Sequence, residues 1–389
     1  MIKEKKSLKV NKSPSRRKFF KAAAATGVAA VAASSLAAPA VAAERVEAAM
    51  VATWPRDFPG LGTGAQRLAK RLSDMSDGRI QVTYYAANER VKAFDSFDEV
   101  ASGNSQMYHG ADYYWVKKHP AFGYFTACPF GFTYSEINAW IHHGGGQALW
   151  DELTDDFGTQ SFIAGNTGVQ MGGWFNKKIR SANDLKGLKM RMPGLGGQVL
   201  GKLGGSPISL PGGQIYENLV SGAIDATEWV GPWNDEAMKF HEAAKYYYYP
   251  GMHEPGSMLA CGVNKSWFTG LTKSDQMIIK TACAWADEIT MAEYNAKNGA
   301  ALGRLINDHG VKLEKFNDKV YDAFAKGAAE VYDEVQQHSD LAARTHKAFV
   351  KARKEIGAWT NLSDSPYIAQ RNRALGPVSY THLTLPTKA

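Results

Sequence analysis

The sequence predicts an α/β fold, and three features support this prediction. Short apolar runs with the alternation of β-strands recur between residues 79 and 229, and segments with helical spacing separate them. Strand–helix alternation of this kind predicts mainly parallel sheets. Hydrophobic residues make up 44% of the 389 residues, so the chain can bury a large core. The last third lacks the alternation and has the spacing of two long helices instead.

The elements of the first two-thirds follow in chain order. Apolar residues between Leu61 and Leu72 share one helical face, which predicts a helix over residues 60–72. After Gly78, residues 79–85 alternate as a strand does. The same criteria predict helices at 94–102, 134–153 (with a break near 144–146), 197–203 and 215–221, and strands at 107–109, 169–175, 188–192 and 224–229.

The spacing of apolar residues in the last third of the sequence predicts two long helices. Thr272 and Asp275 form a pattern similar to a capping box, and apolar residues then recur at helical spacing to about Asn307. Such a helix is about 50 Å long at 1.5 Å per residue, which is enough to brace two lobes. A second helix is expected from Lys319 past Val350 without a break.

Residues 1–42 have the pattern of an export signal. The pair Arg16-Arg17 precedes a weakly apolar Ala/Val run, and an A-x-A cleavage pattern ends at Ala42. This combination resembles a bacterial twin-arginine signal peptide and predicts a periplasmic protein. A membrane anchor is the alternative, but the run is short and weakly apolar.

The positive charge of the chain lies in its two ends. The formal net charge is +7; residues 1–42 contribute +8 and Lys388 contributes +1, which leaves −2 for residues 43–376. This balance argues against a nucleic-acid-binding protein. Residues 377–389 have no helical spacing and resemble a translated sequencing adapter, so we leave them out of the functional interpretation.

One arginine and several oxygen donors stand at the ends of predicted elements. The planar guanidinium of Arg191 suits a carboxylate, although a surface ion pair is the alternative. Glu228, the carbonyl of Trp229, Gln170 and Glu254 offer oxygen ligands of the kind that bind Na⁺, Ca²⁺ or Mg²⁺ rather than zinc. A solvated or helix-capping role is the alternative for each glutamate.

Four segments of the sequence resemble one family. They are residues 168–176, 185–194, 211–229 and 246–254. The runs Leu-Lys-Gly-Leu-Lys-Met-Arg-Met-Pro-Gly and Pro-x-x-x-x-Tyr-x-x-Leu-x-x-Gly-x-Ile-Asp resemble the extracytoplasmic solute-binding subunits of TRAP transporters, the DctP-type family. The runs Asp-Ala-Thr-Glu-Trp and Tyr-Tyr-Tyr-Pro-Gly-x-x-Glu are similar to the branch that binds 2-oxo acids and related monocarboxylates with a metal ion. The resemblance covers roughly residues 50–375.

The resemblance implies a two-lobed periplasmic binding protein fold that closes on a ligand, with a long helix spanning both lobes. Residues 43–376 then form both lobes, which are discontinuous in sequence, and the chain crosses between them near residues 168–176 and 250–260. The implied function is capture of a small carboxylate with a bound cation, Na⁺ or Ca²⁺, and its delivery to the TRAP membrane permease subunits. Catalysis is not implied, and some relatives form homodimers.

The resemblance also assigns roles to individual residues. Arg191 matches the arginine that holds the substrate carboxylate, and Gln170, Glu228, the Trp229 carbonyl and Glu254 match the cage for metal and substrate. Further substrate contacts are expected from Tyr113, Tyr114, Trp229 and Asn176. The signature loop contains Gln214 and Tyr216, and His253 and Trp233 stand where relatives vary in ligand size.

Other functions remain open at this stage. The ligand could be a 2-oxo acid, a hydroxy acid such as lactate, an aromatic acid or a polyol, and the same pocket could serve a sensor rather than a transporter. An exported enzyme is disfavoured because the chain has no G-x-S-x-G, no H-E-x-x-H and no cysteine-cluster spacing. Cys128, Cys261 and Cys283 are expected to be buried free thiols, with one bridged pair as the alternative.

Overall fold

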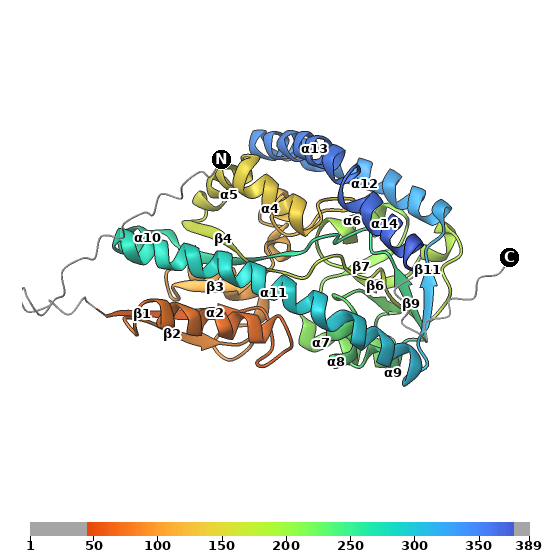
Figure 1. Cartoon of the computed structure of the whole chain (residues 1–389), viewed down its shortest axis with the longest axis horizontal. Coiled ribbons are helices and arrows are strands. Elements are labelled where there is room, and N and C mark those ends of the chain that lie inside the picture. The colour runs from red at the N-terminus through yellow and green to blue at the C-terminus, as the bar shows by residue number, and fades with distance from the viewer. Residues whose placement is uncertain (1–44, 377–389) are drawn as a thin grey trace, which may run out of the picture. The chain divides into compact units, whose positions relative to one another are not determined.

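Residues 45–376 are described by the computed structural model, and they form two β-sheets with helices around them (Figure 1). The α/β prediction is therefore confirmed. The predicted export signal and residues 377–389 lie outside the described residues. Within residues 45–376, none of the helices combines the length and the apolar character that a membrane span requires.

The first sheet has five strands in the order β2-β1-β3-β10-β4. The strands are β1 (Val46–Ala52), β2 (Ile80–Tyr85), β3 (Met107–Gly110), β4 (Thr159–Asn166) and β10 (Met258–Asn264). β1 pairs in parallel with β2 and β3, whereas β10 runs antiparallel to β3 and β4.

The second sheet has six strands in the order β11-β9-β5-β8-β6-β7. The strands are β5 (Gly173–Phe175), β6 (Lys189–Arg191), β7 (Ser206–Ile208), β8 (Ala226–Thr227), β9 (Tyr246–Tyr249) and β11 (Lys312–Lys315). β6 is parallel to β7 and β8, and β11 is parallel to β9, whereas β5 runs antiparallel to β8 and β9.

Helices cover both sheets. α2 packs against β2, α5 against β4, α6 against β7 and α7 against β8. The shorter helices are α2 (Gly62–Met75), α3 (Ser96–Ala101), α4 (Tyr134–His143), α5 (Gly146–Asp155), α6 (Gly194–Lys202), α7 (Gly212–Val220), α8 (Pro232–Ala237), α9 (Phe240–Ala243) and α10 (Lys265–Gly270). The predicted break near residues 144–146 is confirmed, because Gly145 adopts a positive φ of 84° between α4 and α5.

A single long helix, α11 (Lys273–Asn307), runs past both sheets (Figure 1). It packs against α2 and β4 beside the first sheet and against α8 beside the second. Its N-cap is the one expected from the sequence, because the Thr272 hydroxyl accepts a hydrogen bond from the Asp275 amide at 3.1 Å. With 35 residues, the helix has the length that the spacing predicts.

The chain crosses between the sheets three times: along α11 and through two short connections, residues 167–172 and 250–257. The connections bind each other, since the Gln170 amide donates to the Glu254 carbonyl at 3.0 Å and the Gly251 amide donates to the Gln170 carbonyl at 3.1 Å. The backbone of residues 170–172 bonds to several different segments and does not pair with a single strand. The strand predicted over residues 169–175 is therefore shorter than expected, because β5 begins only at Gly173.

The prediction of mainly parallel sheets is confirmed, with one antiparallel strand in each sheet. β5 follows the first crossing connection and β10 follows the second, and each runs antiparallel to both of its neighbours. A helical crossover within one sheet imposes a parallel direction, but a strand that enters from the other sheet is free of this constraint. Periodicity along the chain does not reveal this difference.

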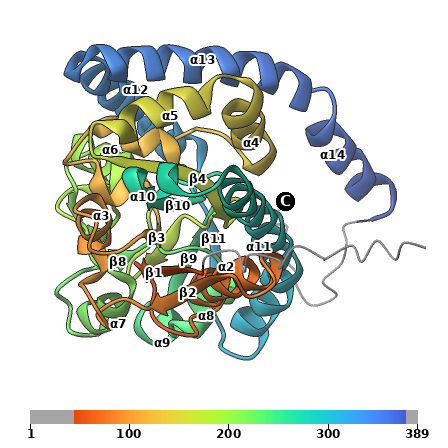
Figure 2. The same cartoon turned by 90° about the vertical axis from the view of Figure 1, so that its left-hand side faces the viewer.

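The prediction of a single helix from Lys319 past Val350 is wrong, because two helices occupy this part of the chain. α12 (Asp318–His338) packs against α6, and α13 (Asp340–Thr360) packs against α4 and α5. Ser339 between them is extended, with φ −161° and ψ 164°. α14 (Asp364–Ala374) follows and has no buried residue (Figure 2).

The core contains many aromatic side chains. Phe125 stacks against Trp140 and Trp150 with ring centroids 5.4 Å apart in both pairs. The three cysteines are buried and free, as expected from their spacing.

Replacing Ser339 should destabilise the protein. The Ser339 hydroxyl accepts the Ala342 amide at 3.1 Å and contacts Nε2 of His119 at 3.0 Å, so Ser339→Ala removes an N-cap. We expect the free energy of unfolding to fall by about 1 kcal/mol in chemical denaturation. Ser363→Ala is the matched control, because Ser363 precedes α14 without a side-chain cap and should change stability by less than about 0.5 kcal/mol. Equal effects of the two substitutions would contradict the capping role.

Candidate binding site

Arg191 and Glu228 lie at the same edge of the second sheet. Arg191 is the last residue of β6, and Glu228 directly follows β8, which is its parallel neighbour. The carboxyl ends of parallel strands meet at one edge, so the register brings the two side chains together. Trp229 comes next, and its ring centroid lies 4.9 Å from the guanidinium carbon of Arg191.

The guanidinium of Arg191 is fully buried and fully partnered. Its Nη1 donates to Oε1 of Glu228, and its Nε donates to the Leu210 carbonyl at 3.2 Å. Its Nη2 lies 3.5 Å from the Tyr114 hydroxyl. Both Arg191 and Glu228 have side chains that are 0% exposed, so each charge needs the other for neutralisation. Burial alone lowers the pKa of Arg191, but the charge of Glu228 together with Tyr114, Tyr113 and Glu254 outweighs burial, so the arginine stays protonated.

Glu228, His253 and Glu254 form a cluster of three possible metal ligands. His253 and Glu254 approach from the connection 250–257, and ligand atoms of the three residues all lie within 4.8 Å of one another. His253 Nε2 is 3.3 Å from Oε2 of Glu228. Burial raises the pKa of Glu254 to about 7, and the charge of Glu228 adds to this shift. Burial lowers the pKa of His253, but its hydrogen bond to Glu228 and the charges of Glu228 and Glu254 together outweigh burial, and the net pKa is raised.

Two oxygen atoms of the crossing connections have no hydrogen-bond partner. They are Oε1 of Gln170 and Oε2 of Glu254, and both are buried. Gln170 donates through Nε2 to the Thr167 hydroxyl at 3.0 Å, which leaves its carbonyl oxygen free for another group. Unpartnered buried acceptors cost free energy, and a cation with oxygen ligands would remove that cost. The donor set therefore fits Na⁺ or Ca²⁺.

A narrow cavity, here called the Arg191 cavity, adjoins these groups. Among the side chains that line it are Trp54, Leu61, Tyr113, Tyr114, Gln170 and Trp229. The two tyrosines lie in a short helical turn after β3 of the first sheet, whereas Trp229 follows β8 of the second. The cavity therefore has walls from both sheets. It holds only about 10 Å³, close to the space that one water needs.

Four of the eight predicted site residues line this cavity. They are Gln170, Tyr113, Tyr114 and Trp229. Arg191 contacts two of the lining residues, Tyr114 and Trp229, and it pairs with Glu228, which clusters with His253 and Glu254.

Asn176 does not reach the Arg191 cavity, which corrects the expectation from the sequence. It is exposed and lines a separate surface hollow with His241 and His309. The reason is strand direction: β5 runs antiparallel to β8, so the end of β5 lies at the opposite edge of the sheet from Glu228. Gln214, Tyr216 and Trp233 are likewise not among the residues that line the cavity.

The sequence gives no signal for Trp54, which also walls the cavity. It follows β1, a strand that the periodicity does not predict, and its ring centroid lies 6.4 Å from that of Trp229. Trp54 Nε1 donates to Nδ1 of His109 at 2.8 Å. Burial lowers the pKa of His109 to about 4, so the imidazole is neutral at physiological pH and can accept this bond.

Comparison with known proteins agrees with this geometry. Residues 50–339 match the model of the DctP family, described as bacterial extracellular solute-binding protein, family 7. The chain belongs to this family. Its members are extracytoplasmic solute receptors of TRAP transporters, so the predicted family, location and membrane partners are confirmed.

Several relatives in the family have named ligands. The monocarboxylate 2-oxoacid-binding periplasmic protein of Nostoc sp. PCC 7120 is 40% identical over 82% of this chain and 87% of its own length. A TRAP solute-binding protein from Pseudoalteromonas atlantica T6c was solved with sodium and pyruvate; it is 38% identical, with a TM-score of 0.82 over 84% of this chain and 99% of that one.

Two further structures contain calcium. One is a TRAP solute-binding protein from Colwellia psychrerythraea with calcium and pyruvate, which is 39% identical with a TM-score of 0.82 over 84% of this chain and 100% of that one. The other, from Bordetella bronchiseptica RB50, is a dimer with calcium and picolinate. It is 32% identical with a TM-score of 0.84 over 85% of this chain and 98% of that one.

Glu254→Gln should stabilise the protein without a cation and remove its response to one. The native pKa of about 7 lies above the ordinary value of 4.5, so ionisation of Glu254 costs stability as pH rises through that window. At pH 8 in chelator we expect a gain of about 1–3 kcal/mol in the free energy of unfolding. Added Ca²⁺ should raise the melting temperature of the wild type more than that of the variant.

The control for this substitution is Glu330→Gln, an exposed carboxylate on α12. It should leave both the stability in chelator and the Ca²⁺ response unchanged. A variant at Glu254 that is less stable in chelator and still responds fully to Ca²⁺ would exclude this carboxylate as a cation ligand.

Proposed function

We propose that this TRAP receptor captures a small 2-oxo acid such as pyruvate together with Na⁺ or Ca²⁺, and that it does so without catalysing a reaction. The observation that carries the proposal is a fully buried arginine in contact with the wall of the Arg191 cavity, together with buried oxygens of Gln170 and Glu254 that have no hydrogen-bond partner. The relatives solved with pyruvate and with sodium or calcium support it.

The charges of the site explain why a cation is needed. Ionised Glu228 and Glu254 carry two negative charges, against the fixed positive charge of Arg191 and that of His253 when it is protonated, and a bound carboxylate would add a further negative charge. In a buried site this excess is costly, and a cation would offset it. Glu228, Glu254 and Gln170 would hold the cation through their oxygens, and the Trp229 carbonyl stays a predicted fourth ligand.

On ligand binding, Arg191 would exchange the carboxylate of Glu228 for the carboxylate of the ligand. Without ligand its Nη1 is neutralised by Glu228. A ligand carboxylate would take the donors of the guanidinium, which suit two parallel hydrogen bonds, and Glu228 would then turn toward the cation. Tyr114, 3.5 Å from Nη2, lies where it can donate to the same carboxylate. Burial raises the pKa of Tyr114 to about 12, so its hydroxyl keeps its proton.

Residues 45–376 would act as two lobes, one around each sheet. The Arg191 cavity is too small to admit an acid of several atoms, so entry requires the walls to separate. The crossing connections 167–172 and 250–257, which carry the site, are the places where the lobes would hinge. A ligand that contacts both walls binds the closed arrangement better and so shifts the population toward it.

An aromatic acid is a second candidate ligand. Trp54, Tyr113, Tyr114 and Trp229 wall the cavity with rings, and the Bordetella relative was solved with picolinate. A polyol is disfavoured, because it carries no charge for the buried guanidinium of Arg191.

Arg191→Lys tests the proposal. Lysine keeps the positive charge beside Glu228 but loses the planar pair of donors. We expect the affinity for pyruvate, measured calorimetrically in saturating Ca²⁺, to fall at least about tenfold. The control is Arg304→Lys, an arginine paired with Glu236 at the surface, which should bind pyruvate normally. Unchanged affinity in Arg191→Lys would refute carboxylate capture by this residue.

A further inference from the structure

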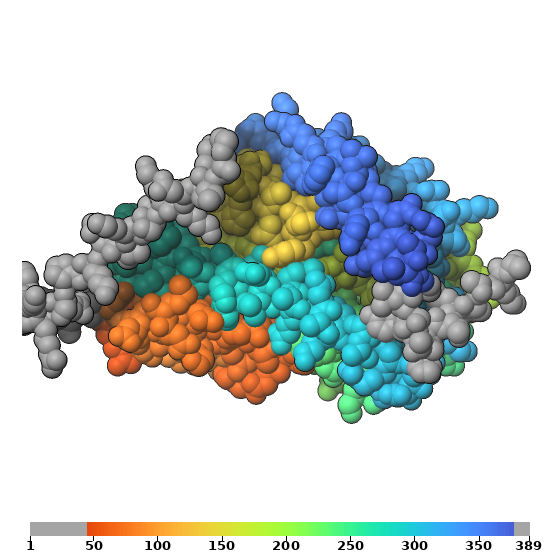
Figure 3. Space-filling model, in the orientation of Figure 1, coloured from red at the N-terminus to blue at the C-terminus, as the bar shows by residue number. Residues whose placement is uncertain are grey.

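A second cavity, here called the α4–α11 cavity, lies between α4, α5 and α11 and shares no lining residue with the Arg191 cavity. Its volume is about 370 Å³, within the range of small-molecule sites. Phe162 and Ile163 of β4 form its apolar floor. Figure 3 shows the yellow surface of this part of the chain recessed between α11 in cyan and α13 in blue.

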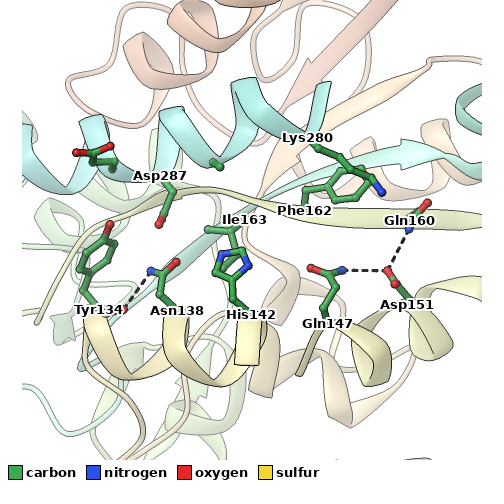
Figure 4. A pocket seen from close by; sticks show the side chains of 12 residues that line it. Tyr134, Asn138, His142, Gln147, Asp151, Gln160, Phe162, Ile163, Lys280 and Asp287 are labelled. Carbon is green, nitrogen blue, oxygen red and sulfur yellow. Dashed lines mark hydrogen bonds between the residues drawn. The ribbon is translucent and has the colours of Figure 1, made fainter. Parts of the chain in front are cut away.

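One end of the α4–α11 cavity is satisfied by the protein itself. Asp151 on α5 accepts hydrogen bonds at its Oδ1 from Nε2 of Gln147 at 2.9 Å and from Nε2 of Gln160 at 3.3 Å (Figure 4). Lys280 lies near this end, and its Nζ is 5.6 Å from the ring centroid of Phe162. This end therefore needs no ligand to complete it.

The other end is only partly satisfied. Hydrogen bonds from the side chains of Asn138 and Tyr134 oppose the rise in the pKa of Asp287 that its burial causes, but one carboxylate oxygen is left over. Asp287 on α11 is only 3% exposed, and its Oδ1 has no hydrogen-bond partner. Figure 4 shows its carboxylate directed toward Tyr134, Asn138 and His142 of α4 across the cavity. Asn138 uses Nδ2 to donate to the Tyr134 carbonyl at 3.1 Å. A buried carboxylate oxygen without a donor is costly, and a donor from a ligand would remove that cost.

The sign of the charge around the cavity favours a cationic ligand. Asp151, Asp287 and Glu288 contribute three carboxylates, against the single lysine at the far end. The pKa of His142 is lowered by burial and by the neighbouring His143, so it adds little positive charge at neutral pH. A phosphate or a second carboxylate would meet repulsion here.

We propose that the α4–α11 cavity binds a small organic amine, whose ammonium group pairs with Asp287 and whose apolar part packs on Phe162 and Ile163. A metal ion fits less well. Among residues 45–376, the group of three metal-ligating side chains that converges is the one around Glu228, and it belongs to the other cavity. The proposal does not depend on the function of the Arg191 cavity.

Benzylamine is a suitable probe, because it joins an ammonium group to one apolar ring. Isothermal titration of the whole protein at pH 8 should detect benzylamine binding, and saturating pyruvate and Ca²⁺ should not abolish it. Benzyl alcohol, which has the same shape without the charge, should bind at least about tenfold more weakly. Equal affinity for the alcohol, or no binding of the amine at millimolar concentration, would overturn the proposal.

Asp287→Asn tests whether the carboxylate of Asp287 pairs with the ammonium group. The substitution keeps the size of the side chain and removes its charge, so benzylamine affinity should fall at least about tenfold while pyruvate binding, the check on folding, stays unchanged. The matched control is Asp333→Asn, an exposed aspartate on α12, which should bind benzylamine like the wild type. Unchanged benzylamine affinity in Asp287→Asn would also overturn the proposal.

Affinity for benzylamine should also fall at low pH. Burial raises the pKa of Asp287 to about 7, so the carboxylate that pairs with the ammonium is largely lost at pH 5. The other titratable groups that line the cavity are Tyr134 and His142 from α4, Asp151 from α5, and Lys280 and Glu288 from α11. Protonation of His142 repels the amine and acts in the same direction. An affinity that is constant from pH 8 to pH 5 would contradict pairing with Asp287.

Discussion

The complete burial of the Arg191 charge is the constraint on which the binding site depends. A guanidinium that is 0% exposed must have anionic partners, and Glu228 supplies the first. Glu254 then lies within reach of Glu228, and its pKa is raised by burial and by the charge of Glu228. His253 relieves part of this repulsion. The cluster is therefore short of positive charge, which is why a cation and a carboxylate ligand can enter it together.

The fold positions this cluster between the two sheets. Parallel pairing of β6 with β8 brings Arg191 and Glu228 to one edge, and the connections 167–172 and 250–257 bring the remaining oxygens to the same edge. Walls from both sheets face the Arg191 cavity, while α11 packs against elements of both. The connections that cross between the sheets thus also carry the proposed binding residues, so movement of the sheets and ligand binding would be linked.

Local features of the fold could be predicted from the sequence, whereas its long-range pairings could not. The cap at Thr272 and the apolar stripe after it predict α11, because both are local. β4 is buried on both faces because the helices α11 and α5 pack against it, so it lacks the alternation that marks a strand. Motif resemblance identified Arg191 and Glu228, but their contact across 37 residues depends on sheet register. The expectation for Asn176 is wrong for the same reason, since the direction of β5 is set by a distant neighbour.

Linkage between cation and ligand is the most direct test of coupled binding. The affinity for pyruvate should be measured calorimetrically over a series of free Ca²⁺ concentrations, from chelator to saturation. If one cation enters with each ligand, pyruvate affinity rises with Ca²⁺ with a logarithmic slope near one until the site saturates, and pyruvate raises Ca²⁺ affinity by the same factor. Pyruvate affinity that is equal in chelator and in saturating Ca²⁺, with Na⁺ also excluded, would contradict the account.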